Sequence, residues 1–172
     1  MNKAVFLDRD GVLTCSKTPP ENINNIRVMP NIEKLLLYLK NNSFLIFCIT
    51  NQPDISRGTK TLKEAQEVND ILWANYPEII RFDICPHSDG DHCVCRKPKP
   101  GMIIANAKEY NIDLSKSWMV GDRWRDIGAG INAGCKTIFF NYRNQGELKD
   151  YVPDFIAKNV KEIINIFERN II

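Results

Sequence analysis

The chain has 172 residues, a length that suits one domain with one sizeable core. Its hydrophobic fraction of 44% and charged fraction of 26% are ordinary for a globular protein, and a formal net charge of +2 excludes attraction to nucleic acid or membranes through bulk charge. No apolar run approaches the roughly 18 residues that span a bilayer, and the first apolar run ends on an aspartate, unlike a secretory signal. We therefore expect one cytoplasmic domain over residues 1–172, and we take a monomer as its simplest state.

Short apolar runs alternate with amphipathic segments along the whole chain. In chain order, the pattern predicts a strand at 3–8, a helix at 31–41, a strand at 43–50, a helix at 61–75, a strand at 81–85, a helix at 101–110, a strand at 117–121, a helix at 126–133, strands at 136–141 and 154–157, and a closing helix that carries 160–167. Thr61 and Glu64 have the spacing of a capping box at the start of the second helix. Apolar strands that alternate with helices indicate a three-layer α/β fold, with a mainly parallel sheet covered on both faces.

Polar side chains stand at the ends of three predicted strands. Asp8 and Thr50 close the first two strands, and Asp122 follows the strand at 117–121. Ligands of parallel sheets bind at the carboxyl ends of the strands, so we expect these three residues to share one site.

The segment "FLDRDG" places Asp8 and Asp10 two positions apart, followed by a glycine that lets the chain turn away. Two close carboxylates suit a divalent metal, or a nucleophile paired with an acid/base, although calcium loops and ordinary Asp-Gly turns share this pattern. In "ITNQ", the Thr50 hydroxyl could donate to a phosphoryl oxygen, while Thr and Asn also simply begin turns.

Two later segments add charged groups. In "MVGDRWRDIGAG", Asp122 could complete a magnesium site and Asp126 could orient a ligand from behind it, or could cap the following helix. In "CRKPKPG", Pro98 disfavours helix at Lys97, which favours an extended loop there. A lysine fixed near carboxylates could neutralise a transferring phosphoryl group, whereas an isolated Arg-Lys pair is more often solvated surface.

Three of the six cysteines cluster in "CPHSDGDHCVC" with two histidines. Cys85, His87, Cys93 and Cys95 supply the four ligands of a closed, structural zinc site, with His92 as a competitor for His87. A disulfide is disfavoured in the cytoplasm, and scattered reduced thiols are the remaining alternative. Cys48 and Cys135 belong to apolar runs as buried thiols, and Cys15 stands alone in a loop.

The succession of DxDG, Thr, Lys and an apolar strand ending in GD resembles the haloacid dehalogenase (HAD) superfamily of phosphatases, from Asp8 to about residue 133. The resemblance implies a Rossmann-like fold in which Asp8 is the nucleophile and Asp10 the general acid/base. Thr50 and Lys97 would hold the phosphoryl group. Magnesium would sit on the Asp8 side chain, the Asp10 main-chain carbonyl and Asp122.

A narrower resemblance rests on "DRDG", "TNQPDISRG", the zinc loop at 85–95, "RKPKPGM" and "VGD". Together these are similar to the D-glycero-D-manno-heptose 1,7-bisphosphate phosphatase branch, which also contains histidinol-phosphate phosphatase domains. The short intervals between motifs leave no room for a cap domain, so loops would build the pocket. By that analogy Asn51, Arg57, Arg96 and Arg123 contact the substrate, and arginines suit a second phosphate.

The leading interpretation is thus a magnesium-dependent phosphatase that releases the C7 phosphate of a heptose 1,7-bisphosphate through an aspartyl-phosphate. A histidinol-phosphate phosphatase, or a phosphatase of another small sugar phosphate, is the alternative within the enzyme class. A zinc-stabilised binding domain without catalysis is the alternative outside it. A nucleic-acid end-processing phosphatase would require a basic groove, which the near-neutral charge does not supply.

Overall fold

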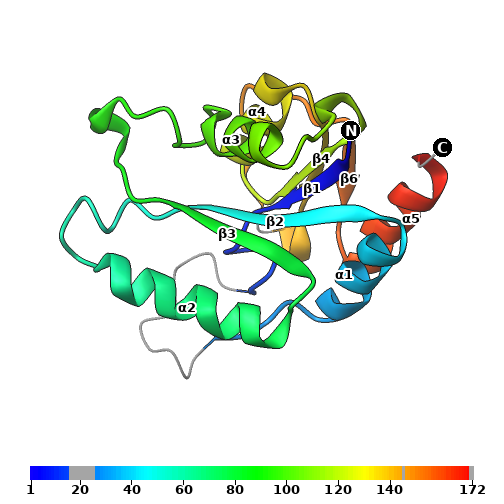
Figure 1. Ribbon diagram of the computed structural model, residues 1–172, viewed down its shortest axis with the longest axis horizontal. Helices are drawn as coiled ribbons and strands as arrows, with labels where there is room; N and C mark the ends of the chain where they lie inside the picture. Colours follow the sequence, from blue (N-terminus) through cyan, green and yellow to red (C-terminus); the bar gives the residue numbers. More distant parts are fainter. Residues whose placement is uncertain (16–25, 145, 171–172) are drawn as a thin grey trace.

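The computed structural model describes residues 1–15, 26–144 and 146–170, and a six-stranded parallel sheet forms its centre (Figure 1). The strand order is β3-β2-β1-β4-β5-β6, and all five pairings are parallel. In chain order the elements are β1 (Lys3–Leu7), α1 (Ile32–Asn41), β2 (Phe44–Asn51), α2 (Leu62–Asn75), β3 (Ile79–Cys85), α3 (Gly101–Glu109), β4 (Trp118–Gly121), α4 (Trp124–Ala133), β5 (Lys136–Phe140), β6 (Phe155–Ala157) and α5 (Val160–Asn170).

The helices cover both faces of this sheet, which confirms the predicted three layers. In Figure 1, α3 and α4 lie on one side, while α1, α2 and α5 lie on the other. Alternate β1 side chains serve the two cores: Val5 and Leu7 pack in the core that contains α1 and α5, and Phe6 packs in the core that contains α3 and α4. Strands buried on both faces explain the continuous apolar runs of the sequence.

Element boundaries follow local chemistry. The Thr61 side chain accepts from the Glu64 backbone while Glu64 reaches back to the Thr61 backbone, so the predicted capping box of α2 is confirmed. Helix α4 was expected to begin at Asp126 but begins at Trp124, because the Asp126 carboxylate accepts from the backbone N–H of Arg123 at 3.0 Å and caps the helix from inside its first turn. Cys48 and Cys135 are buried, as expected.

The order of the strands places the candidate site. The chain runs from β1 outward through β2 to β3, then crosses back over the other face to β4, which pairs with β1 on its free side. Connections therefore leave the carboxyl ends of β1 and β4 toward opposite faces, and such a switch point opens a crevice. In the described part between β1 and β2 the only helix is α1, and none of the described helices is long and apolar enough to cross a membrane.

Candidate active site

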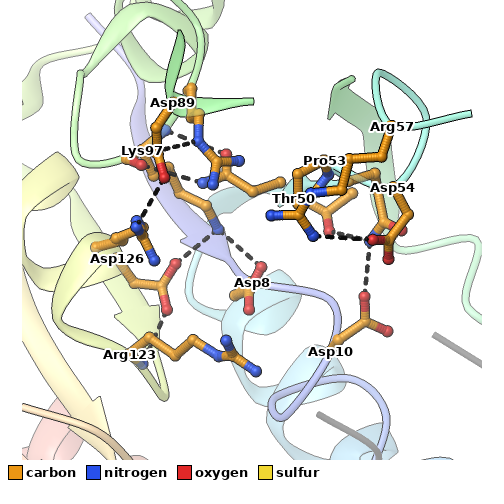
Figure 2. Close-up of a pocket in the computed structure, with 14 residues that line it drawn as sticks. Asp8, Asp10, Thr50, Pro53, Asp54, Arg57, Asp89, Lys97, Arg123 and Asp126 are labelled. Carbon is orange, nitrogen blue, oxygen red and sulfur yellow. Dashed lines mark hydrogen bonds and ion pairs between the residues drawn. The ribbon is translucent and has the colours of Figure 1, made fainter. Parts of the chain in front are cut away.

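Asp8 lies directly after β1, at the floor of the crevice. Its backbone N–H donates to the Val120 carbonyl of β4 at 3.0 Å, which extends the β1–β4 pairing up to the carboxylate. Lys97 arrives from the loop after β3, and its Nζ lies 2.7 Å from Asp8 Oδ1 and 2.7 Å from Asp126 Oδ1 (Figure 2). The Ile49 carbonyl accepts a third bond from Nζ at 2.8 Å. One buried ammonium thus joins the end of β1, the strand β2 and α4.

Burial dominates the electrostatics of this centre. Burial and the neighbouring Asp126 raise the pKa of Asp8 to about 7, although Lys97 opposes the rise. Burial alone would lower the pKa of Lys97, but the Asp126 and Asp8 carboxylates reverse this and hold that pKa above its ordinary value. Lys97 is therefore a fixed cation, and the carboxylates around it carry more negative charge than it can balance.

Asp122 adds a further buried carboxylate to this centre. Both of its carboxylate oxygens are buried, and neither has a hydrogen-bond partner among the described residues. Burial, with Asp8 and Asp126 nearby, raises its pKa to about 8. Oxygens of these three aspartates lie within 4.8 Å of one another. A buried carboxylate without a partner is costly, and oxygen-rich clusters suit Mg²⁺, so the residues fit a divalent cation.

Gly11 makes this close approach possible. Its φ of +103° lies outside the range that other residues favour, and a Cβ at this position would stand 2.4 Å from Asp122 Cγ. The turn of the "DRDG" segment can therefore fold against the Asp122 carboxylate only because the fourth residue is glycine.

Asp10 faces the cavity from the loop after β1, and its carboxylate is held by several donors. Arg9 Nη2 lies 3.0 Å and Gln52 Nε2 2.8 Å from Asp10 Oδ2, and the Thr14 hydroxyl contributes at 3.3 Å to Oδ1. Arg9 is fully buried and also donates to Asn69 Oδ1 of α2 at 2.9 Å. The structure thus ties Asp10 to α2 through a charged side chain inside the protein.

Thr50 and Asn51 close β2 beside this loop. The buried Thr50 hydroxyl lines the cavity and accepts from Gln52 at 2.9 Å. The Asn51 amide exchanges two bonds of 3.1 Å with the backbone N–H and carbonyl of Lys97. Asn51 therefore orients the Lys97 loop, in addition to lining the cavity where the sequence predicted a substrate contact.

The cavity measures about 410 Å³, and arginines stand around its rim. Arg57 pairs with Asp54 at 3.2 Å on one side, and Asp89, which pairs with Arg96 at 2.7 Å, lies on the other (Figure 2). Its lining residues are Asp8, Asp10, Thr50, Asn51, Gln52, Pro53, Asp54, Arg57, Asp89, Arg96, Lys97, Arg123, Arg125 and Asp126.

The cysteine-rich loop between β3 and α3 brings four metal-ligand atoms together. Ligand atoms of Cys85, His87, Cys93 and Cys95 lie within 4.8 Å of one another, and the cysteines are free thiols. A tetrahedral zinc with Zn–S bonds of about 2.3 Å implies edges of about 3.8 Å. Cys85 Sγ lies 3.8 Å from Cys93 Sγ and 3.7 Å from His87 Nδ1, whereas Cys95 Sγ lies closer, 2.9 Å from Cys85 Sγ and 3.3 Å from His87 Nδ1. Three thiols and one imidazole gathered in this way are a donor set that fits zinc. His92 is exposed, outside the cluster, with a φ of 48°.

The sequence did not predict the contacts that three further residues make in the site. Arg9 and Gln52 hold Asp10, and both stand inside motifs whose other members were recognised. Asp89 contacts Arg96 and Arg125, and no local pattern marks a pairing that spans 36 positions. Asp126 was expected behind the metal site or as a cap, and the structure adds a direct ion pair with Lys97.

Comparisons with known proteins agree on one group. A family model described as HAD-hydrolase-like matches residues 94–163. The D-glycero-beta-D-manno-heptose-1,7-bisphosphate 7-phosphatase of Helicobacter pylori strain J99 is 34% identical over 169 residues, which cover 95% of this chain and 96% of the relative. The D-glycero-alpha-D-manno-heptose-1,7-bisphosphate 7-phosphatase of Campylobacter jejuni is 34% identical over 170 residues, with 96% of each chain covered.

Solved structures show the same architecture. The D,D-heptose 1,7-bisphosphate phosphatase of B. bronchiseptica, complexed with magnesium and phosphate, superposes with a TM-score of 0.80 at 24% identity, over 97% of this chain and 98% of its own. A putative HAD-like phosphatase from Mesorhizobium loti also gives 0.80, at 23% identity, over 98% and 87%.

Proposed function

Because the chain belongs to the D-glycero-D-manno-heptose-1,7-bisphosphate 7-phosphatase family of HAD-like hydrolases, we propose that it removes the C7 phosphate from such a heptose bisphosphate with the help of Mg²⁺. One observation carries the chemistry. The Asp8 carboxylate lies 2.7 Å from Lys97 Nζ at the floor of the cavity, in a cluster with the unpartnered Asp122 carboxylate. We further propose that the whole chain acts as one cytoplasmic, monomeric phosphatase domain.

In the first half-reaction, an Asp8 oxygen attacks phosphorus. The bond between phosphorus and the C7 oxygen breaks, and the Asp10 carboxyl group gives its proton to that leaving oxygen. The dephosphorylated sugar departs with a free C7 hydroxyl, and Asp8 holds the phosphoryl group as an acyl phosphate. Lys97 stabilises this step because its fixed charge faces both the nucleophile and the incoming anionic group.

In the second half-reaction, Asp10 acts as a general base, because it lost its proton in the first half-reaction. It takes a proton from water while the water oxygen attacks phosphorus, and the bond from phosphorus to Asp8 breaks. Inorganic phosphate leaves, Asp8 is again a carboxylate and Asp10 again carries its proton. Thr50 and Lys97, both at the cavity wall, would hold the phosphoryl oxygens throughout.

Mg²⁺ would be held by the Asp8 and Asp122 carboxylates and by the main-chain carbonyl of Asp10. When bound, it supplies positive charge that offsets repulsion between the phosphate ester and Asp8. Asp126 keeps Lys97 in place from behind, through its 2.7 Å ion pair. Zinc on the four-residue cluster would be structural, since four protein ligands leave no open position.

Recognition of the sugar bisphosphate is assigned to the cavity rim. Arg57, Arg96 and Arg123 line the cavity and could bind a second phosphate through paired hydrogen bonds. Carboxylates that could attract an ammonium group, Asp54 and Asp89, each pair with an arginine. This pairing favours a bisphosphate over the amino group of histidinol phosphate.

The test is phosphate release by purified protein with Mg²⁺, measured in parallel on heptose 1,7-bisphosphate anomers and histidinol phosphate. Phosphorus NMR of the product should show loss of the C7 phosphate and retention of the C1 phosphate. Asp8→Asn should abolish turnover while circular dichroism shows an unchanged fold. Hydrolysis of histidinol phosphate alone would overturn the sugar assignment, and no hydrolysis of either substrate or of p-nitrophenyl phosphate would favour a non-catalytic binding domain.

A further inference from the structure

Asp89 is an acidic side chain placed where the proposed function requires an anion to bind. It lies in the 3-10 turn Asp89–Asp91 of the cysteine-rich loop and lines the cavity together with Arg57, Arg96 and Arg125. Its Oδ1 lies 2.7 Å from Arg96 Nε, and its Oδ2 lies 3.3 Å from Arg125 Nη2. One carboxylate therefore bridges an arginine of the loop and an arginine of α4.

The bridge leaves donors of these arginines available. Asp89 gives one oxygen to each arginine, so neither receives the two parallel bonds that a guanidinium can make. Arg125 Nε is buried and has no hydrogen-bond partner within residues that the structure describes. A phosphate offers more oxygens and more charge than a carboxylate, and could fill donors that Asp89 leaves unfilled.

Both arginines are also anchored by contacts that do not involve Asp89. Arg96 Nη1 donates to the His87 carbonyl at 3.0 Å, and its side chain is only 9% exposed. The Arg125 guanidinium stacks over the Trp124 ring at 4.6 Å. Asp89 itself is 67% exposed. The carboxylate is thus the mobile partner of the bridge, free to turn into water while the arginines stay in place.

The bridge stands next to the proposed reaction centre in a defined way. Arg96 precedes Lys97, Arg125 precedes Asp126, and the Lys97 and Asp126 side chains pair at 2.7 Å. The two chain segments therefore carry an inner ion pair at the reaction centre and, one residue earlier on each, two arginines that share Asp89. Both arginines therefore line the same cavity as Asp8 and Lys97.

We infer that the Asp89 carboxylate occupies, in the substrate-free protein, the position that a second phosphate of the substrate takes between Arg96 and Arg125. The inference rests on the proposed function, because it names the residue with which the second phosphate competes. A dianionic phosphate displaces Asp89, whereas a monoanion gains too little to do so. Asp89 is thereby a specificity-determining residue that reserves the two arginines for strongly charged groups.

The first test requires no turnover. Inorganic phosphate is titrated into isotope-labelled protein while NMR follows the Nε–H signal of Arg96. Asp89→Asn should lower the half-saturating phosphate concentration about three- to tenfold, as expected for removal of two ion pairs whose shared carboxylate is largely exposed. Asp91→Asn is the matched control, because Asp91 has the same charge and the same turn but contacts Ser88 rather than an arginine. An unchanged or higher half-saturating concentration in Asp89→Asn would overturn the inference.

The second test uses the substrates. The ratio of KM for the heptose bisphosphate to KM for p-nitrophenyl phosphate, which has one phosphate, should fall about three- to tenfold in Asp89→Asn and stay at the parent value in Asp91→Asn. A ratio that rises would show that Asp89 positions the arginines instead of competing with substrate. If the parent protein does not hydrolyse the bisphosphate, the proposed substrate fails, and the NMR titration still decides the role of Asp89.

Discussion

Replacement of Lys97 by methionine tests the charge arrangement at the centre of the site. The substitution keeps the length and the apolar stem of the side chain but removes an ammonium that contacts two carboxylates at 2.7 Å. Asp8 and Asp126 then face each other with oxygens no more than 4.8 Å apart, and no cation between them. At an effective dielectric constant of about 20, two unit charges at that distance repel by about 3.5 kcal/mol.

This value agrees with the cost of about 3–5 kcal/mol that is typical when one partner of a buried ion pair is removed. The cost should depend on pH, because a proton on either carboxylate relieves the repulsion. We therefore expect Lys97→Met to lower the free energy of unfolding by about 3–5 kcal/mol at pH 8 and by clearly less at pH 5.5. Loss of the fixed charge should also reduce kcat/KM by at least about 100-fold.

The assay is urea unfolding of parent and variant at both pH values, without added Mg²⁺ and with zinc retained. The double variant Lys97→Met/Asp126→Asn is the control, since it removes the second carboxylate along with the lysine. It should regain about 1–3 kcal/mol of stability but no activity. A single variant within 1 kcal/mol of the parent at pH 8, or a loss equal at both pH values, would refute the reasoning.

Two further predictions concern the metals. The pKa values of Asp8 and Asp122 are raised to about 7 and about 8, so protons compete with Mg²⁺ for these carboxylates, and calorimetry should find Mg²⁺ binding at least about tenfold weaker at pH 6 than at pH 8. The Asp122→Asn variant should bind Mg²⁺ weakly at both pH values. Binding by the parent protein that does not change with pH would contradict this assignment. Metal analysis should find about one zinc per chain, and Cys93→Ser should lose the zinc and unfold at a lower urea concentration. The control Cys15→Ser, which lies outside the cluster, should keep both the zinc and the stability of the parent. A parent protein without zinc, together with equal stability of parent and Cys93→Ser, would remove the structural role.

The layers follow from the alternation of apolar strands with amphipathic helices in the sequence, whereas the strand order was not predicted and comes from the structure. Every predicted strand and helix is present, and boundaries differ by one or two residues. The start of α4 differs because Asp126 caps the helix from within, so its polar side chain conceals two helical residues before it. Strand β3 begins at Ile79, two residues before the predicted start, because no residue type in the sequence marks where the preceding turn ends.

The site was predictable where motifs stand at strand ends, because parallel strands bring those ends together. Asp8, Thr50 and Asp122 are gathered in this way, and Asp10 and Lys97 reach the same site from the loops after β1 and β3. Their catalytic roles remain proposals. The buried Arg9 and the bridging Asp89 were not predictable. Their partners lie 60 and up to 36 positions away, and they are selected by side-chain packing, which leaves no periodic trace in the sequence.

The proposed catalytic carboxylates follow the central strands, whereas much of the cavity lining stands on the connecting loops, and this separation affects how the substrate preference of such an enzyme can change. The carboxylates proposed for chemistry follow directly from β1 and β4 in the middle of the sheet, where five parallel pairings restrict movement. The cavity-lining residues Pro53, Arg57 and Asp89 stand on the connections after β2 and β3, toward one edge of the sheet. Substitutions, insertions or deletions in those connections can reshape the cavity while the nucleophile keeps its register. Substrate preference can therefore change in this architecture while the position of the proposed nucleophile is kept.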